Sequence, residues 1–128
     1  MCRLPVVDAP LPTVLVVDDD PRMRELLTLL LRFSKFEVVT AASPAQALAA
    51  LHERPDIALV LADIVMPEMN GYDLAEEIEK IRPGMALVFM SGASADQMRR
   101  PVNVPCLAKP FTVEELLSAV RQGLKGAL

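Results

Sequence analysis

The stretch IALVLAD at residues 57–63 decides the fold: six apolar residues lead into an aspartate. Two further runs have the same form, because VLVV at 14–17 leads into DDD at 18–20, and MALVFM at 85–90 leads into Ser91. Short, continuous apolar runs of this kind are typical of strands that are buried on both faces, as in parallel sheets. We therefore expect a parallel sheet whose strands carry polar side chains at their carboxyl ends.

Strand-like and helix-like segments alternate five times along the chain, which predicts a βα series on that sheet. The other two strands are weaker, since residues 36–40 are partly polar and residues 102–107 contain a proline, which is tolerated only at an edge. The fourth helix, around 95–100, is short because Pro101 ends it. The first helix opens at a proline, and its pattern predicts an apolar side made of Met23, Leu26, Leu27, Leu30 and Phe33.

The chain of 128 residues is long enough for one domain with a buried core. Residues 1–12 contain three prolines and an aspartate and are interpreted as a flexible leader, followed by the domain at 13–125 and a tail at 126–128. The excess of 17 acidic over 13 basic side chains argues against direct nucleic-acid binding. No apolar run reaches the ~18 residues of a membrane span. Cys2 and Cys106 fit no disulfide or metal spacing, so the cytoplasm is the expected compartment.

Ligands of parallel α/β sheets bind beyond the carboxyl ends of the strands, where this chain places acids, a hydroxyl and an amine. Asp18, Asp19 and Asp63 would repel one another there unless a divalent cation lay between them. Carboxylate oxygens are the ligands that Mg²⁺ prefers, and Mg²⁺ often takes phosphate oxygens as well. With Lys109 and Ser91 opposite, the sequence predicts a site for a cation and a phosphoryl group, in which one carboxylate can be the nucleophile.

The ordered set of motifs resembles the receiver domain of bacterial two-component response regulators. The matching pieces cover about residues 13–125 and are VLVVDDDPRMRELL, LVLADIVMPEMNGYDL, LVFMSG and LAKPF. The resemblance implies a doubly wound, flavodoxin-like α/β fold with five parallel strands in the order 2-1-3-4-5 and helices on both faces. It also implies a phosphorelay function, in which a histidine of a sensor kinase or of a histidine phosphotransfer protein donates the phosphoryl group and a downstream protein partner reads the result.

Carried over residue by residue, the resemblance makes Asp63 the phosphoryl acceptor. Asp18 and Asp19 become the acidic pair that holds Mg²⁺, or Mn²⁺ in its place, with Asp19 the more direct ligand. The backbone carbonyl of Val65 is a further implied ligand. Such a protein is not an enzyme in the usual sense, because it catalyses only its own metal-dependent phosphotransfer and dephosphorylation.

Ser91 is implied to be the hydroxyl that moves toward the phosphoryl group, and Lys109 the ion-pair partner of that group. The family resemblance also implies a cis peptide bond between Lys109 and Pro110. Where the family often has an aromatic switch residue, this chain has Cys106. Val65 and Ala93 stand at the positions that flank the hydrolytic water in the family, and because neither side chain can hydrogen-bond that water, we expect slow self-dephosphorylation.

The stretch from Ser91 to Lys109 is shorter than is usual in the family, by about one helical turn of ~3.6 residues. The missing turn belongs to the fourth helix, which is part of the usual output and dimer face. The pattern is closest to receivers that are attached to hybrid kinases or that stand alone. We expect a monomer or a weak homodimer without membrane contact.

Two alternatives stay open at the sequence level. Asp18-Asp19-Asp20 contains the Asp-x-Asp pattern of haloacid-dehalogenase-type phosphatases, in which Asp18 would be the nucleophile. A phosphorylation-independent interaction module on a receiver scaffold is the second alternative. Labelling with acetyl phosphate separates the receiver from the phosphatase, because the receiver takes phosphate on Asp63 and the phosphatase takes it on Asp18.

Overall fold

A computed structural model of the protein describes residues 11–92 and 104–126, which form one parallel sheet covered by helices. The described elements are, in chain order, β1 (Thr13–Val17), α1 (Pro21–Phe33), β2 (Glu37–Ala41), α2 (Pro44–Glu53), β3 (Ile57–Asp63), α3 (Gly71–Ile81), β4 (Ala86–Ser91), β5 (Cys106–Ala108) and α4 (Val113–Gly126). All strand pairs are parallel, and the strand order is β2-β1-β3-β4-β5. The predicted doubly wound fold with its 2-1-3-4-5 order is therefore confirmed.

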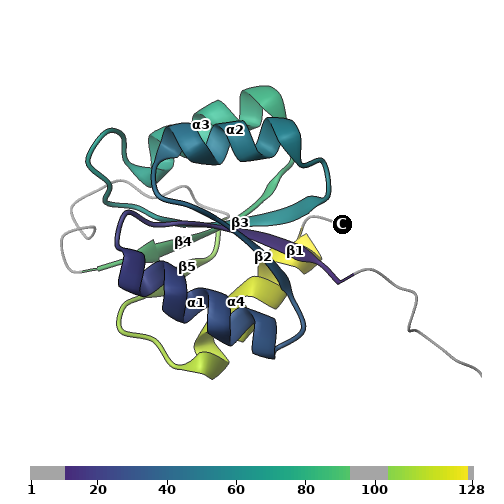
Figure 1. Ribbon diagram of the computed structural model, residues 1–128, viewed down its shortest axis with the longest axis vertical. Coiled ribbons are helices and arrows are strands. Elements are labelled where there is room, and N and C mark those ends of the chain that lie inside the picture. Colours follow the sequence, from purple (N-terminus) through teal and green to yellow (C-terminus); the bar gives the residue numbers. More distant parts are fainter. Residues whose placement is uncertain (1–10, 93–103, 127–128) are drawn as a thin grey trace, which may run out of the picture.

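The helices lie on both faces of the sheet, with α1 and α4 on one side and α2 and α3 on the other (Figure 1). On the first side, Leu27 and Leu31 of α1 and Leu116 of α4 pack in one buried cluster with strand residues. On the second side, Ala47 of α2 and Leu74 of α3 do the same. The side chains of the central strands project alternately into the two clusters and are buried on both faces of the sheet. These strands are therefore apolar throughout, as the sequence indicated.

The strand registers bring the polar ends of the strands to one edge of the sheet. Val17 pairs with Ala62, and Asp63 with Met90, so the residues directly after β1 and at the end of β3 are neighbours. Ser91 ends β4 and pairs with Ala108, whose next residue is Lys109. Polar residues that are far apart in the sequence therefore lie close together in space.

The structure differs from the expectations for α1. Leu27 is buried as predicted, but Leu31 takes the second buried position, while Leu26 and Phe33 are exposed. Leucines fill residues 29–31, so the apolar pattern alone did not define which side of the helix faces the sheet.

The expectations for the rest of the chain had mixed outcomes. The fifth strand, predicted at 102–107, spans only Cys106–Ala108 within the described residues. The shortened fourth helix around 95–100 lies outside the described residues, as do residues 1–10 of the expected leader. None of the four described helices combines the length and the apolar character that a membrane span requires.

Candidate functional site

Three aspartates meet at the carboxyl ends of β1 and β3. Single carboxylate oxygens of Asp18, Asp19 and Asp63 all lie within 4.8 Å of one another. Asp18 is completely buried, Asp63 is 8% exposed and Asp19 is exposed to solvent. The third residue of the run, Asp20, caps α1 instead, because its side chain accepts a hydrogen bond from the backbone N–H of Arg22 at 3.0 Å. The predicted acidic cluster is therefore present, without Asp20.

Among the ion pairs that the described residues form, those of the acidic cluster all come from Lys109. Its Nζ lies 3.5 Å from Oδ2 of Asp18 and 3.4 Å from Oδ2 of Asp63. The backbone N–H of Lys109 donates to the carbonyl of Ser91 at 2.7 Å, which fixes the residue beside the end of β4. The Lys109-Pro110 peptide bond is cis, as the family resemblance implied.

The electrostatics of the cluster are unfavourable when no cation is bound. Burial raises the pKa of the Asp63 carboxyl above its usual value, the Lys109 ammonium opposes this shift, and Asp18 adds to it. Burial also raises the pKa of Asp18, against the hydrogen bond from the backbone of Asp20 and the charge of Lys109. One amine thus faces two buried carboxylates and an exposed third, so the cluster keeps an excess of negative charge.

The donor set fits a hard divalent cation. Oδ2 of Asp18 is buried and has no hydrogen-bond partner among the described residues, although Lys109 lies nearby. A buried carboxylate oxygen is costly without a partner, and a cation bound between the three aspartates would supply one. The described residues therefore include an acidic cluster that could hold Mg²⁺ through Asp18, Asp19 and Asp63.

Two residues without a role in the sequence analysis hold the backbone of the site in place. The Arg24 guanidinium of α1 donates to the backbone carbonyl of Asp18 at 2.7 Å and so holds the loop after β1. Gly71 opens α3 directly against β3, since a Cβ at this position would lie 2.8 Å from the carbonyl oxygen of Asp63 and 3.0 Å from Cα of Ile64. The Asn70-Gly71 pair marked a turn in the sequence, but only the packing shows why glycine is needed there.

The remaining predicted residues lie around the cluster in different ways. Ser91 is 5% exposed at the end of β4, next to the strand that carries Asp63. The backbone N–H of Val65 donates to Oδ1 of Asp63 at 3.4 Å, and its side chain is 40% exposed. Ala93 lies outside the described residues. Cys106 is a free, partly exposed thiol in β5.

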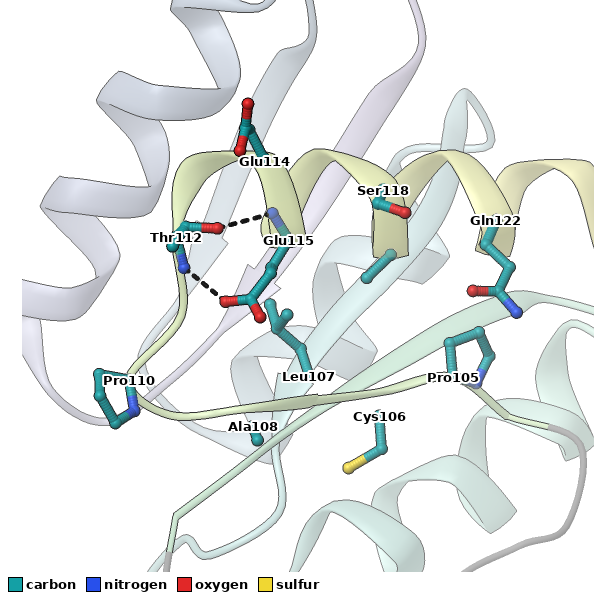
Figure 2. A pocket seen from close by; sticks show the side chains of 11 residues that line it. Pro105, Cys106, Leu107, Ala108, Pro110, Thr112, Glu114, Glu115, Ser118 and Gln122 are labelled. Atoms are coloured by element: carbon teal, nitrogen blue, oxygen red, sulfur yellow. Dashed lines mark hydrogen bonds between the residues drawn. The ribbon is translucent and has the colours of Figure 1, made fainter.

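A second hollow lies apart from the acidic cluster. This groove of about 840 Å³ runs between β5 and α4, and Cys106, Pro110 and Gln122 are among the residues that line it (Figure 2). At the start of α4, Thr112 and Glu115 exchange two hydrogen bonds of 2.8 and 3.0 Å, which cap the helix (Figure 2). The three site aspartates do not line this groove.

Comparison with known proteins agrees with this geometry. Residues 14–121 match the family model of the response regulator receiver domain. The chain belongs to the response regulator receiver family. A solved receiver domain protein from Clostridium thermocellum superposes on this receiver domain with a TM-score of 0.82 at 30% identity, covering 90% of this chain and 95% of that one.

Two curated relatives show different contexts for such a receiver domain. The response regulator receiver protein CpdR of Brucella abortus is 32% identical over 118 residues, which are 89% of this chain and 98% of CpdR. The transcriptional regulatory protein CpxR homolog of Haemophilus influenzae is 35% identical over 117 residues, 88% of this chain but 50% of that protein. The chain spans about half the length of the first curated relatives that it matches.

Proposed function

We propose that this receiver domain accepts a phosphoryl group on Asp63 from a phosphohistidine of a sensor kinase or histidine phosphotransfer protein. The observation that supports this most strongly is the pair of contacts from Lys109 to Asp18 and Asp63, beside an exposed Asp19. The Asp63 carboxylate, the proposed nucleophile, lies at the sheet edge beside the positive charge of Lys109 and two further carboxylates that could hold a cation. These are the elements that phosphoryl transfer requires.

In the proposed step, a carboxylate oxygen of Asp63 forms a bond to phosphorus while the phosphorus–nitrogen bond to histidine breaks. The imidazole leaves with the electron pair of that bond and takes up a proton from solvent, and the product is an acyl phosphate. Mg²⁺ held by Asp18, Asp19, Asp63 and the backbone carbonyl of Val65 would neutralise phosphoryl oxygens. Lys109 would move from its carboxylate partners to the new anion, and Ser91 would donate a hydrogen bond to it.

The proposed receiver carries out this reaction once per phosphoryl group. It returns to its starting state only when its own acyl phosphate is hydrolysed. Its product is a changed protein surface that a downstream partner reads. The match to the receiver family over residues 14–121 favours this function over a phosphatase that uses Asp18 as its nucleophile. The complete burial of Asp18 favours it too, because a nucleophile must be reached by its substrate.

The test is incubation of the protein with acetyl phosphate and Mg²⁺, followed by mapping of the modified residue by mass spectrometry. We expect one phosphoryl group on Asp63 and none in D63N. A phosphoryl group on Asp18, or labelling of D63N at the same rate as the wild type, would overturn the proposal. D73N is a matched control, since Asp73 lies in the first turn of α3, outside the cluster.

A further inference from the structure

Arg24 of α1 reaches back across the start of its helix to the acidic cluster. Its backbone N–H donates to the carbonyl of Asp20 at 3.1 Å, so Arg24 stands one turn into the helix that Asp20 caps. Side chains of a helix point toward its N-terminus, and a long side chain at this position extends past the cap. Nη1 of Arg24 thereby lies 2.7 Å from the carbonyl oxygen of Asp18. At this length the contact is a strong, charge-assisted hydrogen bond.

The charge of Arg24 does not account for this contact. Within the described residues, Arg24 forms no ion pair with any of the three site aspartates, whose ion pairs both come from Lys109. A positive charge beside a cation site repels the cation, so on electrostatic grounds alone Arg24 weakens cation binding. The hydrogen bond to a backbone carbonyl therefore needs another explanation.

Asp19 is the site aspartate whose position depends most on the backbone. It is exposed, and no hydrogen bond or ion pair of the described residues reaches its carboxylate. The peptide groups on its two sides, however, are both held. The N–H of Asp20 donates to Oδ1 of Asp18 at 2.9 Å, and the carbonyl of Asp18 accepts the hydrogen bond from Arg24. Because a side chain starts from the backbone between two planar peptide groups, these bonds determine where the Asp19 carboxylate can lie.

The turn that carries Asp18 and Asp19 is supported from two sides. On one side, the backbone N–H of Asp18 donates to the carbonyl of Ala41, at the end of β2, at 3.2 Å. On the other side, the carbonyl of the same residue accepts from Arg24 of α1. Without Arg24, the peptide group between the two aspartates would lose its hydrogen bond to the helix.

We propose that Arg24 is a positioning residue of the cation site, which holds the peptide group between Asp18 and Asp19 so that both carboxylates are arranged for one divalent cation. This inference rests on the cation site of the proposed function and does not depend on phosphoryl transfer. Removing a group that orients metal ligands typically lowers metal affinity by about 10–100-fold. Because Arg24 acts through the backbone and its loss also removes a repulsive charge, we expect a loss at the lower end of this range, about tenfold.

Binding of Mn²⁺ to the full chain tests the proposal, because the electron paramagnetic resonance signal of free Mn²⁺ falls as the ion binds. R24Q removes the charge and leaves a side chain that is too short to reach the carbonyl, and it should bind Mn²⁺ about tenfold more weakly than the wild type. R24K, whose ammonium can donate to the same carbonyl, should bind more tightly than R24Q although it restores the repulsive charge. The matched control is R22Q, which removes the same charge from an exposed side chain of the same helix and should bind at least as tightly as the wild type.

Electrostatics alone predicts the opposite order of affinities, so the result decides between the two. R24Q that binds Mn²⁺ as tightly as the wild type or more tightly, or R24K that binds no more tightly than R24Q, would overturn the inference and leave the cation site intact. A wild type that binds no Mn²⁺ would overturn the cation site and the inference together. Arg24 is only partly buried, and far-ultraviolet circular dichroism in EDTA verifies that the variants are folded.

Discussion

Replacing Lys109 with methionine tests whether the acidic cluster depends on its one amine. The side chain of Lys109 is 23% exposed, and its Nζ lies within 3.5 Å of two buried carboxylates. At such distances a pair of charges near a protein surface interacts by roughly 4 kcal/mol. Removing one partner of a buried pair costs about 3–5 kcal/mol, since the other charge stays buried without compensation. Because the Lys109 side chain is partly exposed, solvent reduces this cost. We therefore expect K109M to lower the free energy of unfolding by about 2–4 kcal/mol at pH 7 in EDTA.

The chain offers a matched control in Lys80, which forms an ion pair of 3.0 Å with Glu77 on the surface of α3. The Lys80 side chain is 70% exposed, so K80M should lower the free energy of unfolding by no more than about 0.5 kcal/mol. The assay is urea unfolding of both variants, with and without Mg²⁺. Because a bound cation compensates the same carboxylates, Mg²⁺ should shrink the effect of K109M and leave that of K80M unchanged. Equal losses in EDTA, or a K109M loss that Mg²⁺ does not reduce, would refute the reasoning.

Three further predictions follow from the same contacts. G71A should lower the free energy of unfolding by about 1–3 kcal/mol and slow phosphorylation, because the added Cβ would push against the Asp63 carbonyl; unchanged urea unfolding and labelling rates would contradict this. Burial raises the folded-state pKa of Asp63, so in EDTA its contribution to stability is full below the unfolded pKa and is lost as the pH rises through the folded pKa. D63N should therefore be more stable than the wild type at pH 7, with a difference that shrinks toward pH 4 in urea titrations; a constant difference would count against it. V65N, which places a hydrogen-bonding group on an exposed side chain near Asp63, should shorten the phosphoryl lifetime severalfold in a decay assay, and an unchanged lifetime would show that the position does not limit hydrolysis.

The sheet and the acidic site could be predicted from the sequence because each depends on a local pattern. Apolar runs define β1, β3 and β4, and parallel strands place their carboxyl ends at one edge, so Asp18 and Asp63 had to be neighbours. The family resemblance added the strand order and the cis bond between Lys109 and Pro110.

Other features of the fold and of the site depend on tertiary packing, which local sequence patterns do not indicate. Leucines on several sides of α1 made its buried face ambiguous, and Phe33, expected inside, is 90% exposed. The hydrogen bond from Arg24 to the Asp18 carbonyl joins a helix to a loop through a long side chain, which the spacing of the residues did not indicate. The need for glycine at position 71 comes from the close approach of α3 to β3.

The central claim is that Asp63 accepts a phosphoryl group from histidine at a site completed by a divalent cation. The most direct measurement is transfer of radiolabelled phosphate from a phosphorylated histidine phosphotransfer domain to the full chain, with Mg²⁺ or with EDTA. We predict label on the wild type with Mg²⁺, little label in EDTA and none on D63N, while D73N behaves as the wild type. Transfer to D63N, or transfer that is equally fast in EDTA, would contradict the account.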